Sequence, residues 1–151
     1  NAPGYLFSGP GLLMFTIGVL GMGAAYFDLT LGATGFGLHS MLLASMLTLV
    51  GAQVTGFGVF STVAADPIRR PTDPVTTRLL AAASLERVAG AGLLVTAAGG
   101  VYGLAMAAEW VASGFTQLPF VMGDVVAMTA VVLGIQLLFS AFFVQALTTG
   151  E

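Results

Sequence analysis

The sequence predicts an all-α integral membrane protein whose four transmembrane helices form two parallel-repeated helical hairpins, with both termini cytoplasmic. Three observations lead to this fold class. Of the 151 residues, 57% are hydrophobic and only 7% are charged, and the mean hydropathy is +0.98. Four long apolar stretches follow one another, and a motif in the second recurs in the fourth. We expect residues 1–151 to form a single membrane domain.

The charged residues are too few to cover a soluble protein. About a quarter of the residues of an ordinary soluble domain are charged, so the outer surface of this chain must face lipid. Four Arg without any Lys cannot line a nucleic-acid backbone, which excludes nucleic-acid binding. The absence of Cys excludes disulfides, thiolate metal sites and a Cys nucleophile.

The first two apolar stretches cover residues 11–27 and 38–64. A helix needs about 20 apolar residues to cross a hydrocarbon core of about 30 Å, because each residue rises about 1.5 Å. Both stretches approach or exceed this length. Between them, the segment from Asp28 to Gly37 contains several glycines and an acid, which indicate a short turn at the membrane interface.

The third and fourth apolar stretches cover residues 88–108 and 120–147, and Trp110 between them is suited to anchor at the interface. The longest polar connection, residues 65–87, joins the two hairpins and contains every Arg of the chain. Arg in short loops is retained on the cytoplasmic side. We therefore expect this loop and both termini to be cytoplasmic, in a plasma (inner) membrane.

The end of this connection, from Val75 to Arg87, has two interpretations. It is either a short helix that lies on the membrane, with its leucines in the lipid, or an extension of the third transmembrane helix. Both remain open.

An internal repeat relates the two predicted hairpins. Val50-Gly51-Ala52-Gln53-Val54 matches Leu133-Gly134-Ile135-Gln136-Leu137, and Phe60 and Phe143 follow at the same offset of 83 positions. The first and third stretches match more weakly at an offset of 81. Two hairpins of the same orientation make a parallel repeat, whereas many secondary transporters use an inverted one.

Small residues within the apolar stretches are candidate helix-packing seams, because helices associate in lipid through close backbone approach. The candidates are Gly18, Gly21 and Gly23 in the first stretch, Ala52-xxx-Gly56 in the second, and Gly99-xxx-Gly103 in the third.

Four polar side chains in or near the apolar stretches are expected to make interhelical contacts: His39, Gln53, Gln136 and Asp124. The two glutamines occupy equivalent repeat positions, and because an unsatisfied amide is costly in lipid, each should find a partner across the bundle. His39 is interpreted as a structural residue at the interface, with axial ligation of a porphyrin-like pigment as the alternative. Asp124 is expected to cap the fourth helix, with a proton relay as the alternative.

No residue pattern in the chain indicates catalysis. One His and scattered carboxylates do not make a metal site, and no combination of nucleophile, base and orienting group is evident. A phosphate-binding glycine loop would need a Lys, which the chain lacks. We therefore assign no catalytic residue and expect no metal and no cofactor.

The arginine cluster is the most informative polar feature. Arg69, Arg70, Arg78 and Arg87 at a cytoplasmic interface are suited to hold a lipid phosphate or headgroup, because a guanidinium binds phosphate with two hydrogen bonds. The alternative is that the arginines only determine the topology.

Three motifs occur in order along the chain. They are Tyr5-Leu6-Phe7-Ser8-Gly9-Pro10-Gly11, the helix from His39-Ser40-Met41-Leu42-Leu43 to Gly51-Ala52-Gln53, and Gly134-Ile135-Gln136-Leu137-Leu138-Phe139-Ser140-Ala141-Phe142-Phe143. Together with Ser84-Leu85-Glu86-Arg87, they resemble the C-terminal membrane domain of family-2 glycosyltransferases related to dolichyl-phosphate mannose synthase. The resemblance extends over nearly the whole chain.

The resemblance implies an enzyme in which a cytoplasmic nucleotide-sugar-binding domain precedes the membrane helices and transfers a sugar to a polyprenyl phosphate. This chain would be its membrane-anchoring, lipid-presenting domain. Its partners would be membrane lipids, a polyprenyl phosphate and the cytoplasmic glycosyltransferase domain. That catalytic domain would lie before Asn1 and is absent from this chain.

Two other interpretations compete with this one. The chain could be a non-catalytic structural subunit, packed against other subunits of a larger membrane complex or forming an oligomer. A small transporter ranks third, because four helices with few polar groups offer little to line a path.

Overall fold

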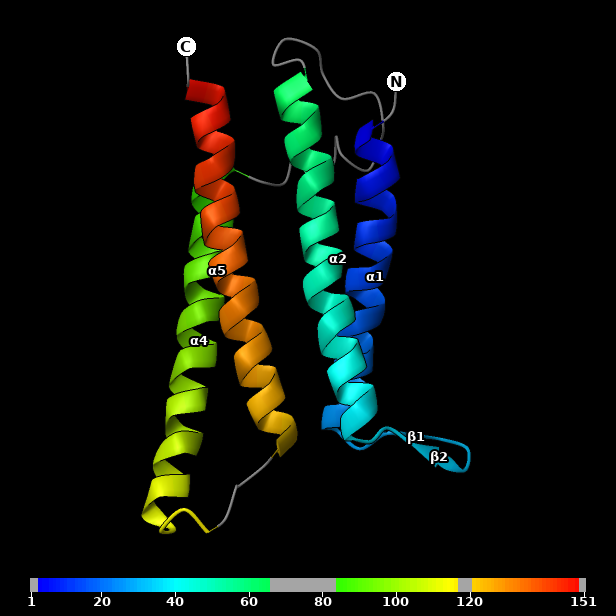
Figure 1. The fold of residues 1–151 in the computed structure, drawn as a ribbon, viewed down its shortest axis with the longest axis vertical. Helices are drawn as coiled ribbons and strands as arrows, with labels where there is room; N and C mark the ends of the chain where they lie inside the picture. The colour runs from blue at the N-terminus through cyan, green and yellow to red at the C-terminus, as the bar shows by residue number, and fades with distance from the viewer. Residues whose placement is uncertain (1–2, 66–83, 117–120, 150–151) are drawn as a thin grey trace.

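The computed structural model describes residues 3–65, 84–116 and 121–149, which form four helices and one two-stranded sheet (Figure 1). The elements in order are α1 (Pro3–Tyr26), β1 (Thr30–Leu31), β2 (Thr34–Gly35), α2 (Leu38–Ala65), α4 (Leu85–Ala112) and α5 (Val121–Thr149). All four helices contain spans long and apolar enough to cross a membrane. The predicted all-α membrane fold of four transmembrane helices is confirmed, and the chain is an integral membrane protein.

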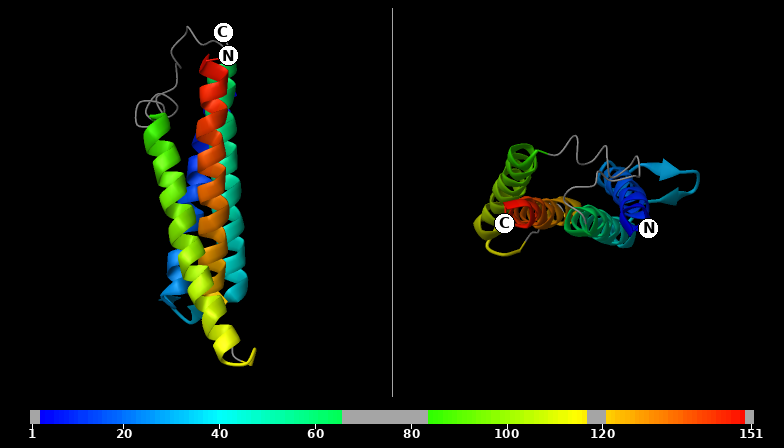
Figure 2. Two further views of the ribbon diagram at one scale, coloured as in Figure 1. Left: turned by 90° about the vertical axis from the view of Figure 1, so that its left-hand side faces the viewer. Right: turned by 90° about the horizontal axis from the view of Figure 1, so that it is seen from above.

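The helices pair as two antiparallel hairpins, α1 with α2 and α4 with α5, and the hairpins meet along α2 and α5. Viewed along the bundle, the helices stand in a curved row in the order α4, α5, α2, α1 (Figure 2). α1 and α4 begin, and α2 and α5 end, at one end of the bundle (Figure 1). We call this the terminal end, and the opposite end, which carries the small sheet, the far end.

Close backbone contacts hold each hairpin together at matching repeat positions. A Cβ added at Gly51 would lie 2.7 Å from the carbonyl oxygen of Gly11, so the first hairpin has no room for a side chain there. In the second hairpin, a Cβ added at Gly134 would lie 2.6 Å from the carbonyl oxygen of Gly92. The offsets of 83 and 81 relate these two contacts. The sequence repeat is therefore also a repeat of helix packing.

A second pair of close contacts, related by the same offsets of 81 and 83, lies nearer the far end. A Cβ added at Gly18 would lie 2.8 Å from the carbonyl oxygen of Ala44, and one added at Gly99 would lie 2.9 Å from that of Ala127. Gly18 and Gly99 were predicted as seam residues. Their place between the helices agrees with the rule that small residues let helices approach closely in lipid.

One glycine of the first predicted seam, and the whole of the second, differ from the prediction. A Cβ added at Gly23 would meet no atom within 4 Å, because this glycine borders a cavity instead of a helix. Ala52 and Gly56 border a wider space between α2 and α5, and a Cβ at Gly56 would meet only the ring of Phe60, on its own helix, at 3.6 Å. The spacing of small residues alone therefore does not distinguish a seam from an open cavity.

Helix α1 begins at Pro3, earlier than the predicted start at residue 11. Proline suits the first turn of a helix, where its missing N–H leaves no bond unmade. Pro10 lies inside the helix, which membrane helices tolerate better than soluble ones. The helix therefore includes residues 3–10, which the predicted stretch left out.

Helix α4 is longer than the predicted stretch 88–108 at both ends. It begins after Ser84, whose side-chain oxygen accepts a hydrogen bond of 3.3 Å from the backbone N–H of Arg87. At its other end, Trp110 lies in the last turn and packs edge-on against Phe115, with ring centroids 5.0 Å apart. Residues 85–87 therefore belong to the third transmembrane helix, while 66–83 lie outside the described residues.

The predicted turn between the first two helices is a short β-hairpin. Thr30 pairs with Gly35 and Leu31 with Thr34, and Gly32 adopts a φ of 68° in the turn between the strands. A left-handed residue is also found where α1 ends, at Asp28, whose φ is 51°. Aspartate tolerates this conformation better than most residues.

The packed core lies near the far end. Met22, Ala25, Met41 and Ala44 of the first hairpin are buried there, and residues near the start of α5 pack against them. Most other apolar side chains are exposed, as expected where the solvent is lipid. The bundle is therefore best packed away from the end where its termini lie.

Candidate functional site

A groove of about 590 Å³ lies between α2 and α5 in the half of the bundle nearer the terminal end. Its walls are mainly apolar, and several of its phenylalanines are half exposed or more, so it opens sideways onto the lipid-facing surface. The volume falls within the range of about 300–1,000 Å³ that is typical of small-molecule sites. The two hairpins together form this groove, since each contributes one wall.

The groove is built from repeat-related residues. Four pairs at the offset of 83 line it: Gln53 with Gln136, Gly56 with Phe139, Phe57 with Ser140, and Phe60 with Phe143. The two walls are thus copies of one helix face, with glycine on one side where the other side carries a phenylalanine. The second and third of these pairs each combine a phenylalanine with a smaller residue, which leaves room that two identical faces would not.

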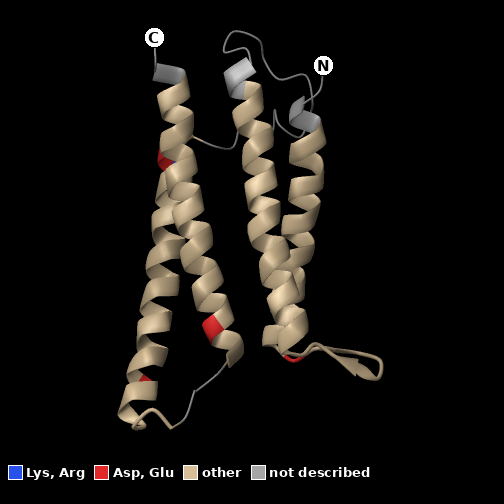
Figure 3. Ribbon diagram, viewed as in Figure 1, with Lys and Arg blue, Asp and Glu red and all other residues tan. Residues whose placement is uncertain are grey.

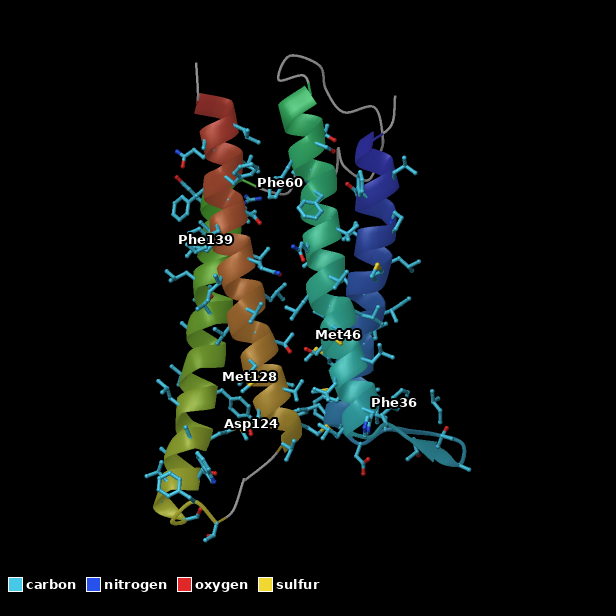
Figure 4. The ribbon with its side chains drawn as sticks, viewed as in Figure 1. Phe36, Met46, Phe60, Asp124, Met128 and Phe139 are labelled. Atoms are coloured by element: carbon cyan, nitrogen blue, oxygen red, sulfur yellow. The ribbon has the colours of Figure 1, made fainter. Side chains whose placement is uncertain are left out.

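Two contacts between the hairpins bound the groove along the bundle. Toward the terminal end, the rings of Phe60 and Phe143 pack edge-on with centroids 5.0 Å apart. Toward the far end, the hydroxyls of Ser45 and Thr129 form a buried hydrogen bond of 2.6 Å. Figure 4 shows Phe60 at the upper part of this seam, well above Asp124. The seam between these contacts is where the groove opens.

The two predicted amides both line the groove. Gln53 is exposed on α2 and Gln136 is partly buried on α5. The Oε1 atom of Gln136 is buried, and it has no hydrogen-bond partner among the residues that the structure describes. The structure thus brings the glutamines to one site, while the cross-bundle partner expected for Gln136 is not seen in this part of the chain.

The described part of the arginine cluster is Arg87, which is exposed in the first turn of α4 at the terminal end. Its neighbour Glu86 is the acid of that turn. Arg69, Arg70 and Arg78 lie outside the described residues. In sequence they belong to the connection between the end of α2 and the start of α4, both of which are at the terminal end.

The other two predicted polar residues lie away from the groove. His39 is exposed in the first turn of α2, and Asp124 lies in the first turn of α5, where its charge suits the helix dipole. Both turns are at the far end, where Asp28 and Glu109 also lie, and Figure 3 shows these acids spread over the ends of separate helices. Asp124 lines a smaller cavity with Trp110 and Met128.

A second cavity lies on the other side of the seam, and sequence reasoning did not predict it. It has a volume of about 340 Å³ and almost entirely apolar walls, formed mainly by α1 and α5. Thr48 borders it and donates one hydrogen bond to the carbonyl oxygen of Ala44, at 2.8 Å. Leu133 lines both cavities and so separates them. No pattern in the sequence pointed to this cavity.

The fold defines a class of polytopic membrane protein: two repeated helical hairpins with a shared groove and no evident cluster of metal ligands among the described residues. Comparison with known proteins narrows this class. A family model described as the glycosyltransferase family 2 C-terminal transmembrane region matches residues 59–148. The chain belongs to this family.

One curated relative is similar in sequence over nearly the whole chain. The low-salt glycan biosynthesis hexosyltransferase Agl6 of Haloferax volcanii is 46% identical over 147 residues, which cover 97% of this chain and 36% of that protein. The chain thus spans about a third of the length of this relative. No solved structure matches the chain significantly. The family suggested by the sequence motifs is confirmed.

Proposed function

We propose that the chain is the membrane-anchoring, lipid-presenting domain of a polyprenyl-phosphate glycosyltransferase. The observation that carries this proposal is the family match, together with a hexosyltransferase relative similar over 97% of the chain. The catalytic domain would be the part that the relative has in addition to this region. The match favours this function over a structural subunit, for which we find no specific support.

The distribution of charge supports an orientation for this domain. All four Arg lie between the end of α2 and the first turn of α4, so they are connected to the terminal end. The acids Asp28, Glu109 and Asp124 and the side chain of His39 belong to the far end. By the positive-inside rule, the terminal end is cytoplasmic, in the plasma membrane. A catalytic domain before Asn1 would then meet nucleotide sugars in the cytoplasm.

The arginines give the domain a role beyond anchoring. A polyprenyl phosphate lies with its chain in the bilayer and its phosphate at the surface, where Arg69, Arg70, Arg78 and Arg87 can bind it. Guanidinium groups suit this task because each offers paired donors in the geometry of a phosphate. The domain would thereby concentrate and orient the acceptor for the catalytic domain.

A domain exchange in the native full-length protein tests this proposal. The 151 residues are replaced by an unrelated four-helix anchor of the same topology, and sugar transfer from a nucleotide sugar to polyprenyl phosphate is measured in membranes. We expect transfer to fall by about tenfold or more while the enzyme stays membrane-bound, because the acceptor is no longer positioned. Unchanged transfer would show that the domain is only an anchor.

A further inference from the structure

We infer that the groove between α2 and α5 holds the isoprene units nearest the phosphate of the polyprenyl acceptor. This inference rests on the proposed function and assigns the acceptor chain to one place in the fold. It follows from the shape of the groove, its place near the end of α2, and the position of the two amides.

The walls suit a branched, unsaturated hydrocarbon. Phe57 and Phe139 present half-exposed or largely exposed rings at the mouth, while Gly56 leaves one wall open. Aromatic rings and aliphatic side chains are the usual lining of sites that bind apolar ligands. An isoprenoid chain carries a methyl branch on every unit and therefore fills a wide groove better than an unbranched acyl chain does.

The groove lies toward the end of α2 from which the arginine-bearing connection leaves. Its upper limit is the Phe60–Phe143 ring pair, and Phe60 is separated from the end of α2 by little more than one helical turn. The connection that follows α2 contains Arg69, Arg70 and Arg78 in sequence, and Arg87 begins the next helix. A ligand with an anionic head and an apolar chain is complementary to a hydrophobic groove that ends within two helical turns of the arginine-bearing connection along the chain.

The glutamines set the depth to which the chain follows the groove. From Phe60 to Gln53 the groove runs along α2 for about 10 Å, at about 1.5 Å per residue. A hydrocarbon does not satisfy the buried Oε1 of Gln136, so it gains nothing by packing further along the amides. The chain therefore leaves the groove for the bilayer at this level, and only its first units are held.

Photo-crosslinking in the full-length protein locates the chain. A polyprenyl phosphate with a diazirine on the units next to the phosphate is bound in nanodiscs, and labelled peptides are identified by mass spectrometry. We expect the label on Phe57, Phe139 and their neighbours in the groove. A phosphatidylglycerol with a diazirine in its acyl chain is the second probe, and we expect it to label the outer surface without enrichment there.

A groove-filling variant tests the same site by kinetics. In Gly56→Trp the indole occupies the groove, and we expect the KM for polyprenyl phosphate to rise about tenfold or more, as the loss of apolar contacts in a pocket typically does. Gly100→Trp is the matched control, because Gly100 faces open space on α4 and lines none of the described cavities. We expect its KM to equal that of the wild type.

The possible outcomes distinguish a failure of the groove inference from a failure of the proposed function. Transfer by the wild type with labels outside the groove would overturn the groove inference and leave the proposed function intact. Equal labelling by both probes, or a Gly56→Trp variant that changes the oligomeric state but not the KM, would also overturn it, in favour of bulk lipid or of a second copy. Absence of any transfer to polyprenyl phosphate by the wild type would overturn both. Crosslinking of the wild type does not depend on whether the variant folds.

Discussion

The ring of Phe60 on α2 packs edge-on against the ring of Phe143 on α5, and the two residues occupy the same position in the two halves of the repeat. Equivalent residues of the two repeat halves therefore contact each other here. It closes the seam between the hairpins toward the terminal end, just above the groove that contains both glutamines. Substitutions in the ring pair test the stability of the bundle, and substitutions in the groove test ligand binding.

A double-mutant cycle measures the ring contact. Phe60→Ala and Phe143→Ala should each destabilise the bundle, and the two effects should not add, because edge-on aromatic pairs contribute about 0.5–1.5 kcal/mol beyond their burial. Reversible unfolding of the full-length protein in mixed micelles gives the free energies. The cycle of Phe60→Ala with Phe139→Ala is the control, and a coupling as large there as for Phe143 would contradict the account.

Gly134 tests the close approach within the second hairpin. A Cβ at Gly134 would lie 2.6 Å from the carbonyl oxygen of Gly92, so Gly134→Ala should force the backbones apart and cost about 1–3 kcal/mol, the usual range for overpacking. Gly100→Ala is the control, since its Cβ would meet nothing within 4 Å. We expect thermal unfolding in detergent to show a lower midpoint for the first variant alone. Equal midpoints would mean that the helices do not pack as described.

Substitution of Gln136 is expected to stabilise the bundle. Its Oε1 is buried without a partner among the described residues, and an unsatisfied acceptor costs about 1–3 kcal/mol. Gln136→Leu should therefore raise the unfolding midpoint. Gln145→Leu should not, because the side chain of Gln145 is exposed and has an interaction partner. A lower midpoint for Gln136→Leu would show that the amide is satisfied in the membrane.

Single cysteines determine which end is cytoplasmic, and the absence of native Cys from these residues simplifies the experiment. Thr34→Cys lies in the β-hairpin at the far end and Glu86→Cys in the first turn of α4, and both positions are exposed. In intact cells, a membrane-impermeant maleimide should label the first variant, and it should label the second only after permeabilisation. The reverse pattern would invert the proposed topology and separate the arginines from any cytoplasmic acceptor site.

The sequence predicted the four spans and their pairing, because hydropathy and the 83-residue repeat are properties of residue type and order. It did not predict where helices end when local signals conflict. The apolar stretch was predicted to start at residue 11, yet α1 begins at Pro3 and passes through Pro10, and Ser84 extends α4 by serving as its N-cap. The sequence showed that Gln53 and Gln136 are equivalent.

The groove itself could not be predicted, because it depends on how far α2 and α5 separate toward the terminal end. The repeat placed Gly56 opposite Phe139 in the alignment, but a glycine in a small-xxx-small pattern indicates a tight seam as readily as an open wall. The contact of Phe60 with Phe143 was present in the sequence only as an equivalence of positions. Equivalent positions in a repeat do not have a predictable distance between them. Which equivalent residues of α2 and α5 contact each other depends on how the two helices pack.

The most direct test of the central claim is the intact mass of the native polypeptide that contains this chain, measured after purification from membranes. The account predicts a mass well above the 15.3 kDa of these 151 residues, because the catalytic domain of the glycosyltransferase would belong to the same polypeptide. A native mass of 15.3 kDa would contradict the account and leave a separate structural subunit as the better explanation.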